Sequence, residues 1–425
     1  MARQMKDSGI EWIGEIPATW DISRVKYVAE FEPSCDTSHL SENSVITYTP
    51  MDCIKNGWFI NNTTLVGNVS SSLTPFHNGD IVMAKVTPCF ENGNIAIMEN
   101  LASGYGLGSS ELFVFRPVDI DTRYFFYWLQ NPMFVQLACS TMTGTGGLKR
   151  VSPYFAKNCY VHYPPFAEQK RIADFLDHRC AEIDAVIKRT KATIEEYKKL
   201  KQAVITEAVT KGVRGPRKMQ DSGIEWIGEI PEGWSVPKFG YVAEVKSNLV
   251  APELYPNHAQ ISPENIEKGS GRLLSYGTVA DVGVISGNHL FYEGQILYSK
   301  IRPKLNKVCI APFEGLCSAD MYPIETHHLT RFVMYCMLSD VFLSQVAMVT
   351  EERVKMPKIN QVELARIRVV MPDSVDEETE IAAYLDEKCT ALDTIIAKKT
   401  ALLNELETYK KSLIYEYVTG KKSVE

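Results

Sequence analysis

The sequence lacks several features that would place it in familiar classes. It has no run of about 18 apolar residues and no cleavable signal pattern at its start, so we expect a cytoplasmic chain without a membrane span. None of its ten cysteines forms a C-x-x-C pair, which predicts reduced, mostly buried thiols and argues against a zinc knuckle. No G-x-x-x-x-G-K-[ST] segment occurs, which argues against ATP binding through a P-loop.

What is present indicates a globular protein of more than one domain. A length of 425 residues suggests two or three domains, and 45% hydrophobic with 23% charged residues is typical of folded chains. The net charge of −7 counts against a chain that is basic throughout. It leaves room for a local basic face.

Two long segments without proline or glycine organise the chain. They span residues 172–210 and 381–419 and align without a gap at an offset of 209. Their Leu, Ala, Glu and Lys content predicts helices, each roughly 60 Å long at about 1.5 Å per residue. Apolar residues recur at steps of four and three, so each helix needs a partner, and the simplest partner is the other copy. The predicted seam includes Leu176, Ile183, Ile187, Ile194, Leu385, Leu392, Ile396 and Leu403. Lys201 and Lys410 interrupt it at matching places, as snorkelling or register-setting lysines.

The rest of the chain is duplicated as well. Residues 5–30 return as residues 219–244, with 17 of 26 positions identical, and the joint lies near residues 212–217. A period near 210 residues is too long for a solenoid repeat and indicates two similar domains with a pseudo-twofold relation. Between the shared pieces lie two variable regions, residues 31–165 and 245–373, both with α/β character. Each contains a helix, expected at residues 122–139 and 330–347.

Three motifs resemble a known family. The W-I-G-E-I-P…W opening lies at residues 12–20 and 226–234, and P-P-F-A-E-Q-K-R-I-A leads into the first long helix at residues 164–173. A G-[DQ]-I-[VL]-x-x-K-[VI]-x-P pattern lies at residues 79–88 and 294–303. Together they resemble the specificity (S) subunits of type I restriction-modification enzymes over essentially the full chain. The second copy departs at residues 371–377, where the P-P-x-x-E-Q pattern is degraded, which leaves open how alike the two helix starts are.

The resemblance implies a fold and a function. It implies two α/β (α+β) target recognition domains in tandem, joined by two long helices that form an antiparallel coiled coil and set the distance between the domains. The domain borders expected on this basis are 1–165 and 213–373 for the recognition domains, with helical spacers at 166–212 and 374–425. Each domain would read one half of a split, asymmetric site in double-stranded DNA. The subunit would be non-catalytic and would recruit two methyltransferase (M) subunits and restriction (R) subunits, and S-adenosylmethionine, ATP and Mg²⁺ are expected on those partners.

Signs of an enzyme in this chain are weak. Residues 131–134, N-P-M-F, are one residue away from the N-P-P-F of adenine methyltransferases, and residues 104–108 could pass for a cofactor loop. The two lie only about 25 residues apart, too close for a βαβ nucleotide unit followed by a catalytic strand. Pro372-Asp373 with residues 386–388 mimics a nuclease motif, but the second part falls on a predicted helix surface. The main alternative is therefore a non-catalytic scaffold in another cytoplasmic assembly.

Candidate DNA contacts lie in two loops of each domain. A lysine common to both copies, at positions 85 and 300, suits a phosphate contact, whereas its changed neighbours suit base reading. Two basic loops, at residues 144–150 and 351–358, are the second group, and ordinary solvated surface is the alternative for each. The predicted contacts are Lys85, Thr87, Asn92, Lys149, Arg150, Lys300, Arg302, Lys304, Lys307, Arg353, Lys355 and Lys358. We further expect Trp12, Trp20, Trp226 and Trp234 to anchor the domain cores, with a surface for the M subunits as the alternative, and His327 and His328 to lie on a surface loop.

Overall fold

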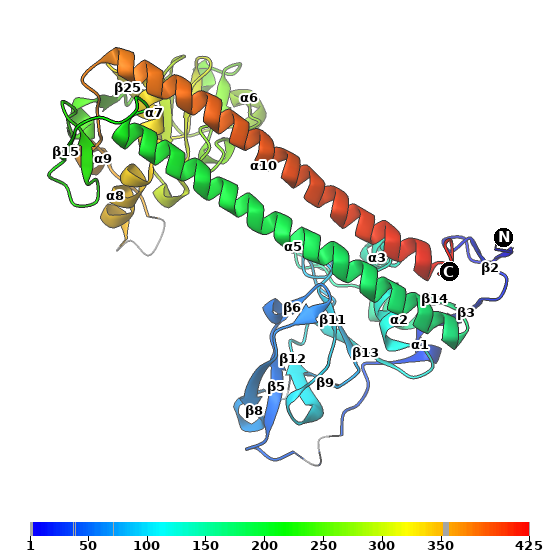
Figure 1. Cartoon of the computed structure of the whole chain (residues 1–425). Coiled ribbons are helices and arrows are strands. Elements are labelled where there is room, and N and C mark those ends of the chain that lie inside the picture. The colour runs from blue at the N-terminus through cyan, green and yellow to red at the C-terminus, as the bar shows by residue number, and fades with distance from the viewer. Residues whose placement is uncertain (1–2, 37, 39, 71, 352–356, 425) are drawn as a thin grey trace. The chain divides into compact units, whose positions relative to one another are not determined.

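The computed structural model describes residues 3–36, 38, 40–70, 72–351 and 357–424 (Figure 1). The chain divides into two compact units, residues 1–190 with 402–425 and residues 191–401. Helices α5 (Phe166–Lys211) and α10 (Val375–Val418) each contribute to both units. The boundary between the two units therefore falls within the long helices, whereas the domain borders expected from the sequence lie at the helix starts.

The first unit carries two four-stranded sheets, with strand orders β11-β10-β13-β4 and β8-β5-β12-β9. Parallel pairing occurs between β5 and β12, and the other neighbours in these sheets are antiparallel. Two-stranded ladders join β1 with β2, β3 with β14, and β6 with β7. The strands are β1 Met5–Asp7, β2 Glu15–Pro17, β3 Asp21–Arg24, β4 Ala29–Phe31, β5 Val45–Thr49, β6 Ile54–Lys55, β7 Trp58–Phe59, β8 Asn62–Leu65, β9 Thr74–His77, β10 Ile81–Ala84, β11 Ile95–Ile97, β12 Tyr105–Gly108, β13 Leu112–Pro117 and β14 Tyr160–Tyr163.

The second unit repeats this topology. Its sheets have the orders β17-β25-β22-β23 and β18-β21-β24-β19-β20, and β19 pairs with β24 in parallel as β5 pairs with β12. The tandem α/β fold expected from the sequence is thus confirmed, and the extra strands are local additions. The strands are β15 Met219–Asp221, β16 Glu229–Pro231, β17 Ala243–Val245, β18 Leu249–Val250, β19 Ala259–Ile261, β20 Gly277–Thr278, β21 Asn288–Phe291, β22 Ile296–Ser299, β23 Val308–Ile310, β24 Gly315–Cys317 and β25 Met321–Thr326.

In each variable region the structure has two helices where the sequence predicted a single one. In the first unit α2 (Thr122–Trp128) ends before Asn131, whose side chain accepts a hydrogen bond from Met133 N and caps α3 (Pro132–Ser140). Proline cannot continue a helix because it lacks the backbone N–H. In the second unit Ser339 caps α8 (Asp340–Thr350) after α7 (Thr330–Leu338). The remaining short helices are α1 Val25–Val28, α4 Pro153–Asn158, α6 Val279–Val282 and α9 Gln361–Arg366.

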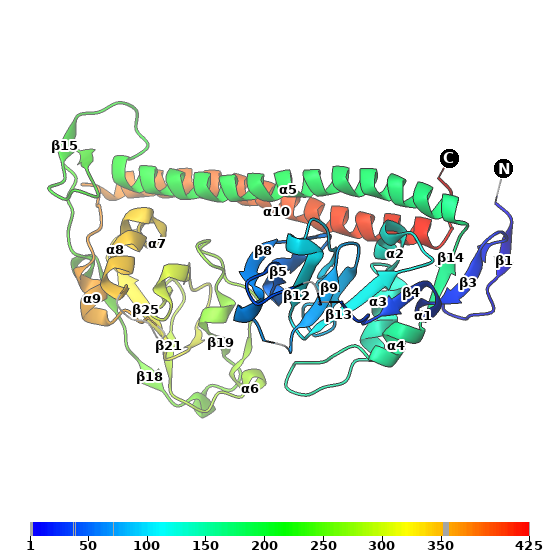
Figure 2. The ribbon, with the colours of Figure 1, turned by 90° about the horizontal axis from the view of Figure 1, so that it is seen from below.

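Within each unit, segments of α5 and α10 run antiparallel (Figure 2). In the first unit the rings of Phe175 and Tyr417 are 4.4 Å apart, and Lys410 Nζ lies 2.8 and 2.7 Å from the two carboxylate oxygens of Asp184. Of the predicted seam residues, Leu176 and Leu385 are fully buried and Ile183, Ile187, Ile194 and Leu403 are at most 9% exposed. Leu392 and Ile396 are half-buried.

The seam lysines are partnered across the helix pair. In the second unit Lys201 Nζ lies 2.8 Å from each carboxylate oxygen of Asp393, which is the same contact as Lys410 with Asp184 in the first unit. The Lys201 side chain is only 8% exposed, so another register would leave a buried cation without its carboxylate. The pairs therefore act to set the register.

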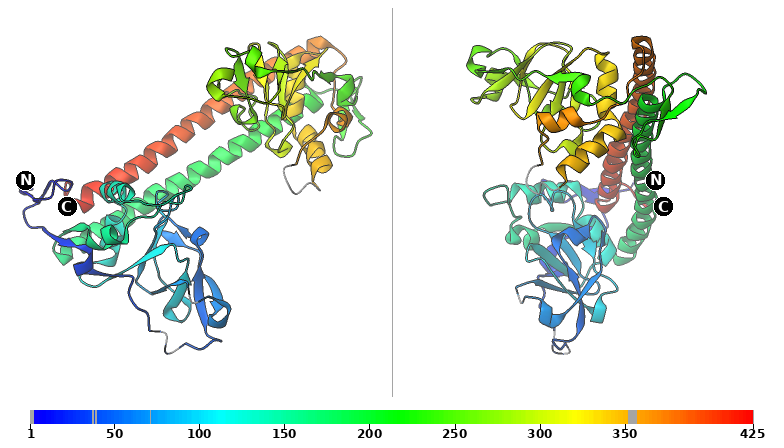
Figure 3. Two further views of the ribbon diagram at one scale, coloured as in Figure 1. Left: turned by 180° about the vertical axis from the view of Figure 1, so that it is seen from behind. Right: turned by 90° about the vertical axis from the view of Figure 1, so that its left-hand side faces the viewer.

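A repeated clamp holds the start of each long helix. Glu168 of α5 accepts hydrogen bonds from Trp20 Nε1 and from Arg3, whose guanidinium lies over the indole ring. Glu377 of α10 does the same with Trp234 Nε1 and Arg217. The first and last described parts of the chain both belong to the first unit and lie close together (Figure 3), and Arg3 of the clamp lines one groove with Gly420.

The residue after each clamp glutamate shows that the two helix starts are alike despite the degraded motif. Gln169 accepts a hydrogen bond from Asp121 N, and Glu378 accepts one from Leu329 N. His328 lies on the loop between β25 and α7, as expected, and its Nδ1 lies 2.7 Å from Glu378, which ties this loop to the helix start.

The four tryptophans of the opening motif differ in how deeply they are buried. Trp20 and Trp234 are buried, as expected for core anchors, whereas Trp12 is half-buried and Trp226 is 51% exposed. The core expectation was therefore wrong for Trp226: its counterpart Trp12 packs edge-on against the His162 ring, and the second unit has Val370 in the place of His162.

Among the described residues no single helix is long and apolar enough to cross a membrane. The bent pair α7 and α8 passes by length and composition only when the two are taken together, and α7 is almost wholly buried in the core of its unit.

Candidate nucleic-acid interface

The lysine shared by the two domains occupies the same turn in both units. Lys85 follows β10 and its backbone N–H donates to Glu111 O; Lys300 follows β22 and its N–H donates to Asp320 O. The Lys85 ammonium lies 5.4 Å from the centre of the Phe113 ring, and the Lys300 ammonium 5.3 Å from that of Tyr322. A cation placed over an aromatic face is held there by the ring quadrupole. The two lysines are thus positioned alike.

Some of the predicted contact residues near Lys85 already make hydrogen bonds within the domain. The Thr87 hydroxyl donates to Gly147 O at 2.7 Å and accepts from Lys149 N at 2.9 Å, so it ties the 144–150 loop in place. Arg150 makes two hydrogen bonds to Glu111, at 2.8 and 2.6 Å. The Arg150 guanidinium is the largest influence lowering the pKa of the Glu111 carboxyl. Asn92 and the Lys149 side chain are exposed.

In the second unit, too, some predicted DNA-contact residues are exposed and others are hydrogen-bonded within the domain. Arg302 and Lys304 are exposed, and Arg302 lies in the left-handed backbone region with φ 45°. Lys307 Nζ donates to Pro263 O at 2.6 Å, and Lys358 Nζ lies 3.0 Å from Asp320. Arg353 and Lys355 lie outside the described residues.

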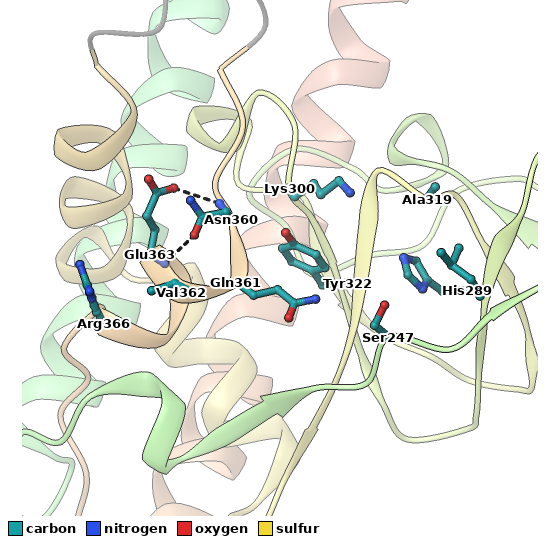
Figure 4. Close-up of a pocket in the computed structure, with 11 residues that line it drawn as sticks. Ser247, His289, Lys300, Ala319, Tyr322, Asn360, Gln361, Val362, Glu363 and Arg366 are labelled. Atoms are coloured by element: carbon teal, nitrogen blue, oxygen red, sulfur yellow. Dashed lines mark hydrogen bonds between the residues drawn. The ribbon is translucent and has the colours of Figure 1, made fainter.

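A groove beside Lys300 gathers residues that the sequence analysis did not single out. It has a volume of about 660 Å³ and is formed by the β17–β18 loop, β21, the turns after β22 and β24, and the start of α9 (Figure 4). His289 and Gln361 lie on its wall. No local motif marks them, because segments far apart in sequence build the groove.

A second kind of groove is present in both units. Both lie between the opening hairpin and the end of a long helix, with volumes of about 790 and about 750 Å³. Five matched pairs of residues line them, which are Arg3 and Arg217, Met5 and Met219, Ile13 and Ile227, Gly14 and Gly228, and Glu15 and Glu229.

The enzyme-like motifs are structural where the chain is described. Asn131 is a buried helix cap and Phe134 is fully buried, so the N-P-M-F segment offers no open site. Asp386 accepts from Tyr335 and pairs with Arg331, as Asp177 does with Tyr127 and Arg123. The described residues contain no cluster of three or more His, Cys, Asp or Glu that could hold a metal ion.

Two domains of one topology, with a shared cation in each and different residues around it, define a tandem recognition protein. Comparison with known proteins gives the family. Residues 17–196 match the family model described as the type I restriction modification DNA specificity domain. The chain is 32% identical over 327 residues to the specificity subunit of the type I restriction enzyme EcoDI of Escherichia coli, with 72% of each chain covered. It is 36% identical over 163 residues to the EcoAI specificity subunit of the same species, covering 37% of this chain and 27% of that one.

The fold has a solved counterpart. A chain from a structure that describes complex assembly and conformational transition of the type I restriction-modification system superposes with a TM-score of 0.70. It covers 96% of this chain and 99% of that chain at 15% identity, so it supports the fold alone. The chain belongs to the family of type I restriction enzyme specificity subunits, which confirms the resemblance drawn from its motifs.

Proposed function

We propose that this protein is the sequence-specific DNA-recognition subunit of a type I restriction-modification complex and reads a bipartite, asymmetric site. The observation that carries the proposal is the lysine turn, which is the same in both units while the residues around it differ. A common cation suits the backbone phosphates that every sequence has, and different neighbours suit two different half-sites. In this reading residues 1–165 and 213–373 are the recognition domains, and residues 166–212 and 374–425 are the spacers.

The duplicated grooves support two copies of one partner. Their matched lining residues present the same surface twice, as two methyltransferase subunits would require. Restriction subunits complete the proposed assembly. S-adenosylmethionine, ATP and Mg²⁺ belong to these partners in the proposal, and the location is the cytoplasm.

The proposal is tested by binding in the presence of a methyltransferase subunit. Salt-dependent binding to a split site supports it, since release of counterions from phosphates weakens such binding as salt rises. A scaffold of similar fold would show no preference among randomised DNA targets.

The purified chain alone is expected to transfer no methyl group, cut no DNA and hydrolyse no ATP. The reason is that the catalysis is assigned to the partner subunits and the enzyme-like segments of this chain are buried or paired. The measurement is incorporation of labelled methyl groups into DNA, with the reconstituted assembly as the positive control. Methyl transfer by the highly purified chain would contradict the prediction.

Lys300→Ala is expected to weaken binding at all sequences alike, whereas Arg302→Ala relaxes the preference at one half-site. Lys300 has a counterpart in Lys85 and Arg302 has none, so we assign the first to phosphate and the second to a base edge. Loss of a bidentate base contact costs roughly 1–3 kcal/mol of discrimination. Binding to a randomised library measures both. A uniform loss in both variants would show that the roles are not divided in this way.

A further inference from the structure

The groove beside Lys300 combines a cation, apolar walls and polar groups. Leu249 and Val362 are each 60% exposed on its walls, and Tyr322 lies buried beneath it. Its volume of about 660 Å³ falls within the usual range for small-ligand pockets, roughly 300–1,000 Å³. It is therefore large enough for one nucleotide unit.

The charge of the groove favours an anion at one end. Lys300 and Arg366 line it, and neither has an ion-pair partner among the described residues. Glu363 is the one carboxylate among the lining residues of the described chain, and it accepts a hydrogen bond from Asn360 N at 3.0 Å as part of a helix cap. The two cations are thus available to a phosphate.

His289 contributes a hydrogen-bonding ring that the fold does not use. The residue is 4% exposed, and within the described part of the chain nothing hydrogen-bonds to its imidazole; Nδ1 is buried without a partner. Burial first, and then the nearby Lys300 ammonium, lower the pKa of the His289 imidazole. The ring is therefore neutral at pH 7, with one donor and one acceptor. A neutral ring suits the edge of a nucleobase better than a phosphate.

Gln361 supplies a second uncommitted polar group. It follows Asn360, which caps α9, and its side chain extends in the direction of Tyr322 (Figure 4). Its amide has no partner among the described residues. A glutamine amide can bind an adenine through N6 and N7 together.

The first unit has the same backbone arrangement at the matching position, but it carries other side chains than His289 and Gln361 there. Its sheet registers place Thr74 at the position of His289, since Thr74 pairs with Gly108 as His289 pairs with Cys317. Pro153 follows the helix cap Ser152 where Gln361 follows Asn360. The lysine and the cap are therefore shared, whereas the imidazole and the amide are particular to the second unit.

We propose that this groove binds one nucleotide of the half-site read by the second domain, with a backbone phosphate at Lys300 and the base edge at His289 and Gln361. The inference rests on the proposed function and adds the subsite through which one base is read.

The test uses the full chain assembled with its methyltransferase partner on a library of randomised targets. His289→Gln and Gln361→Ala are expected to lower discrimination at one base position of one half-site by roughly 5- to 150-fold, the ratio that corresponds to about 1–3 kcal/mol. The other half-site should remain as in the wild type. His289→Ala is added as the full deletion of the ring, and thermal unfolding shows whether it still folds.

Matched controls separate reading from folding. Thr74→Ala changes the corresponding position of the first unit, and Ile285→Ala removes a side chain that is 86% exposed and does not line the groove. Neither is expected to alter preference in the half-site of the second domain. If His289→Gln and Gln361→Ala both keep the wild-type preference at every position, the subsite is refuted even though the assembly reads DNA. If the wild-type assembly itself shows no preference, the proposed function fails instead.

Discussion

Replacing residues 245–373 with the matching region of another family member is expected to change one half of the recognised site completely and leave the other half unchanged. Each unit has its own pair of four- or five-stranded sheets and its own lysine turn. The base-reading candidates of the second unit all lie inside the exchanged region. Methylation mapping of DNA from cells that carry the parent and the exchanged protein measures the result.

The structure shows which residues such an exchange must respect. The core of the second unit is continuous from the exchanged region to both long helices, so Phe332, Val333 and Val370 pack in one cluster with Ile205 and Ile381. Removing a buried apolar side chain here would cost roughly 2–5 kcal/mol. A second version of the exchanged protein that keeps these three side chains is therefore the control for poor folding.

The outcome discriminates between independent and joint reading. A new sequence in one half-site with the original sequence in the other supports independent domains. A change in both half-sites from a stable protein would mean that the two domains read together.

Acidification from pH 7.5 to 4.5 is expected to remove about 2.5 kcal/mol of stability through His162 alone. This residue of β14 is 1% exposed, and its Nδ1 accepts a hydrogen bond from Trp128 Nε1 at 3.0 Å. Burial, and to a lesser degree the charge of Lys421, lower the pKa of the His162 imidazole from 6.5 to about 4. The unfolded chain binds the proton more readily than the folded one. The stabilisation is therefore complete above about pH 6.5 and is lost as pH falls toward 4.

The second unit supplies the control. Cys336 and Val370 take the places of Trp128 and His162, with Cys336 Sγ near Val370 O, so the second unit has no titrating ring there. The double variant Trp128→Phe with His162→Val should lose this part of the pH dependence of stability. The carboxylates, which are the same in the wild type and the variant, should titrate as before. Urea unfolding at several pH values measures the difference. Equal pH slopes for the wild type and the double variant would rule out His162 as the source.

The sequence by itself determined the large features of this protein. Duplicated segments required two similar domains, and proline-free stretches with an apolar seam required two long helices. The equivalence of Lys85 and Lys300 also followed from sequence, since the motif that carries them is local. Periodicity and short motifs report on neighbours in the chain, and these features depend on such neighbours.

Only the tertiary structure decided which polar residues are free to bind. Thr87 is a predicted base reader whose hydroxyl is taken by the 144–150 loop, a partner about 60 residues away. Lys201 is a seam lysine whose carboxylate lies on the other helix. His289 and Gln361 carry no local signal, because the groove that joins them is assembled from strands and turns far apart in the chain. Whether a polar side chain already has a hydrogen-bond or ion-pair partner within the protein depends on its contacts in space. Those contacts exist only after the sheets and helices have packed.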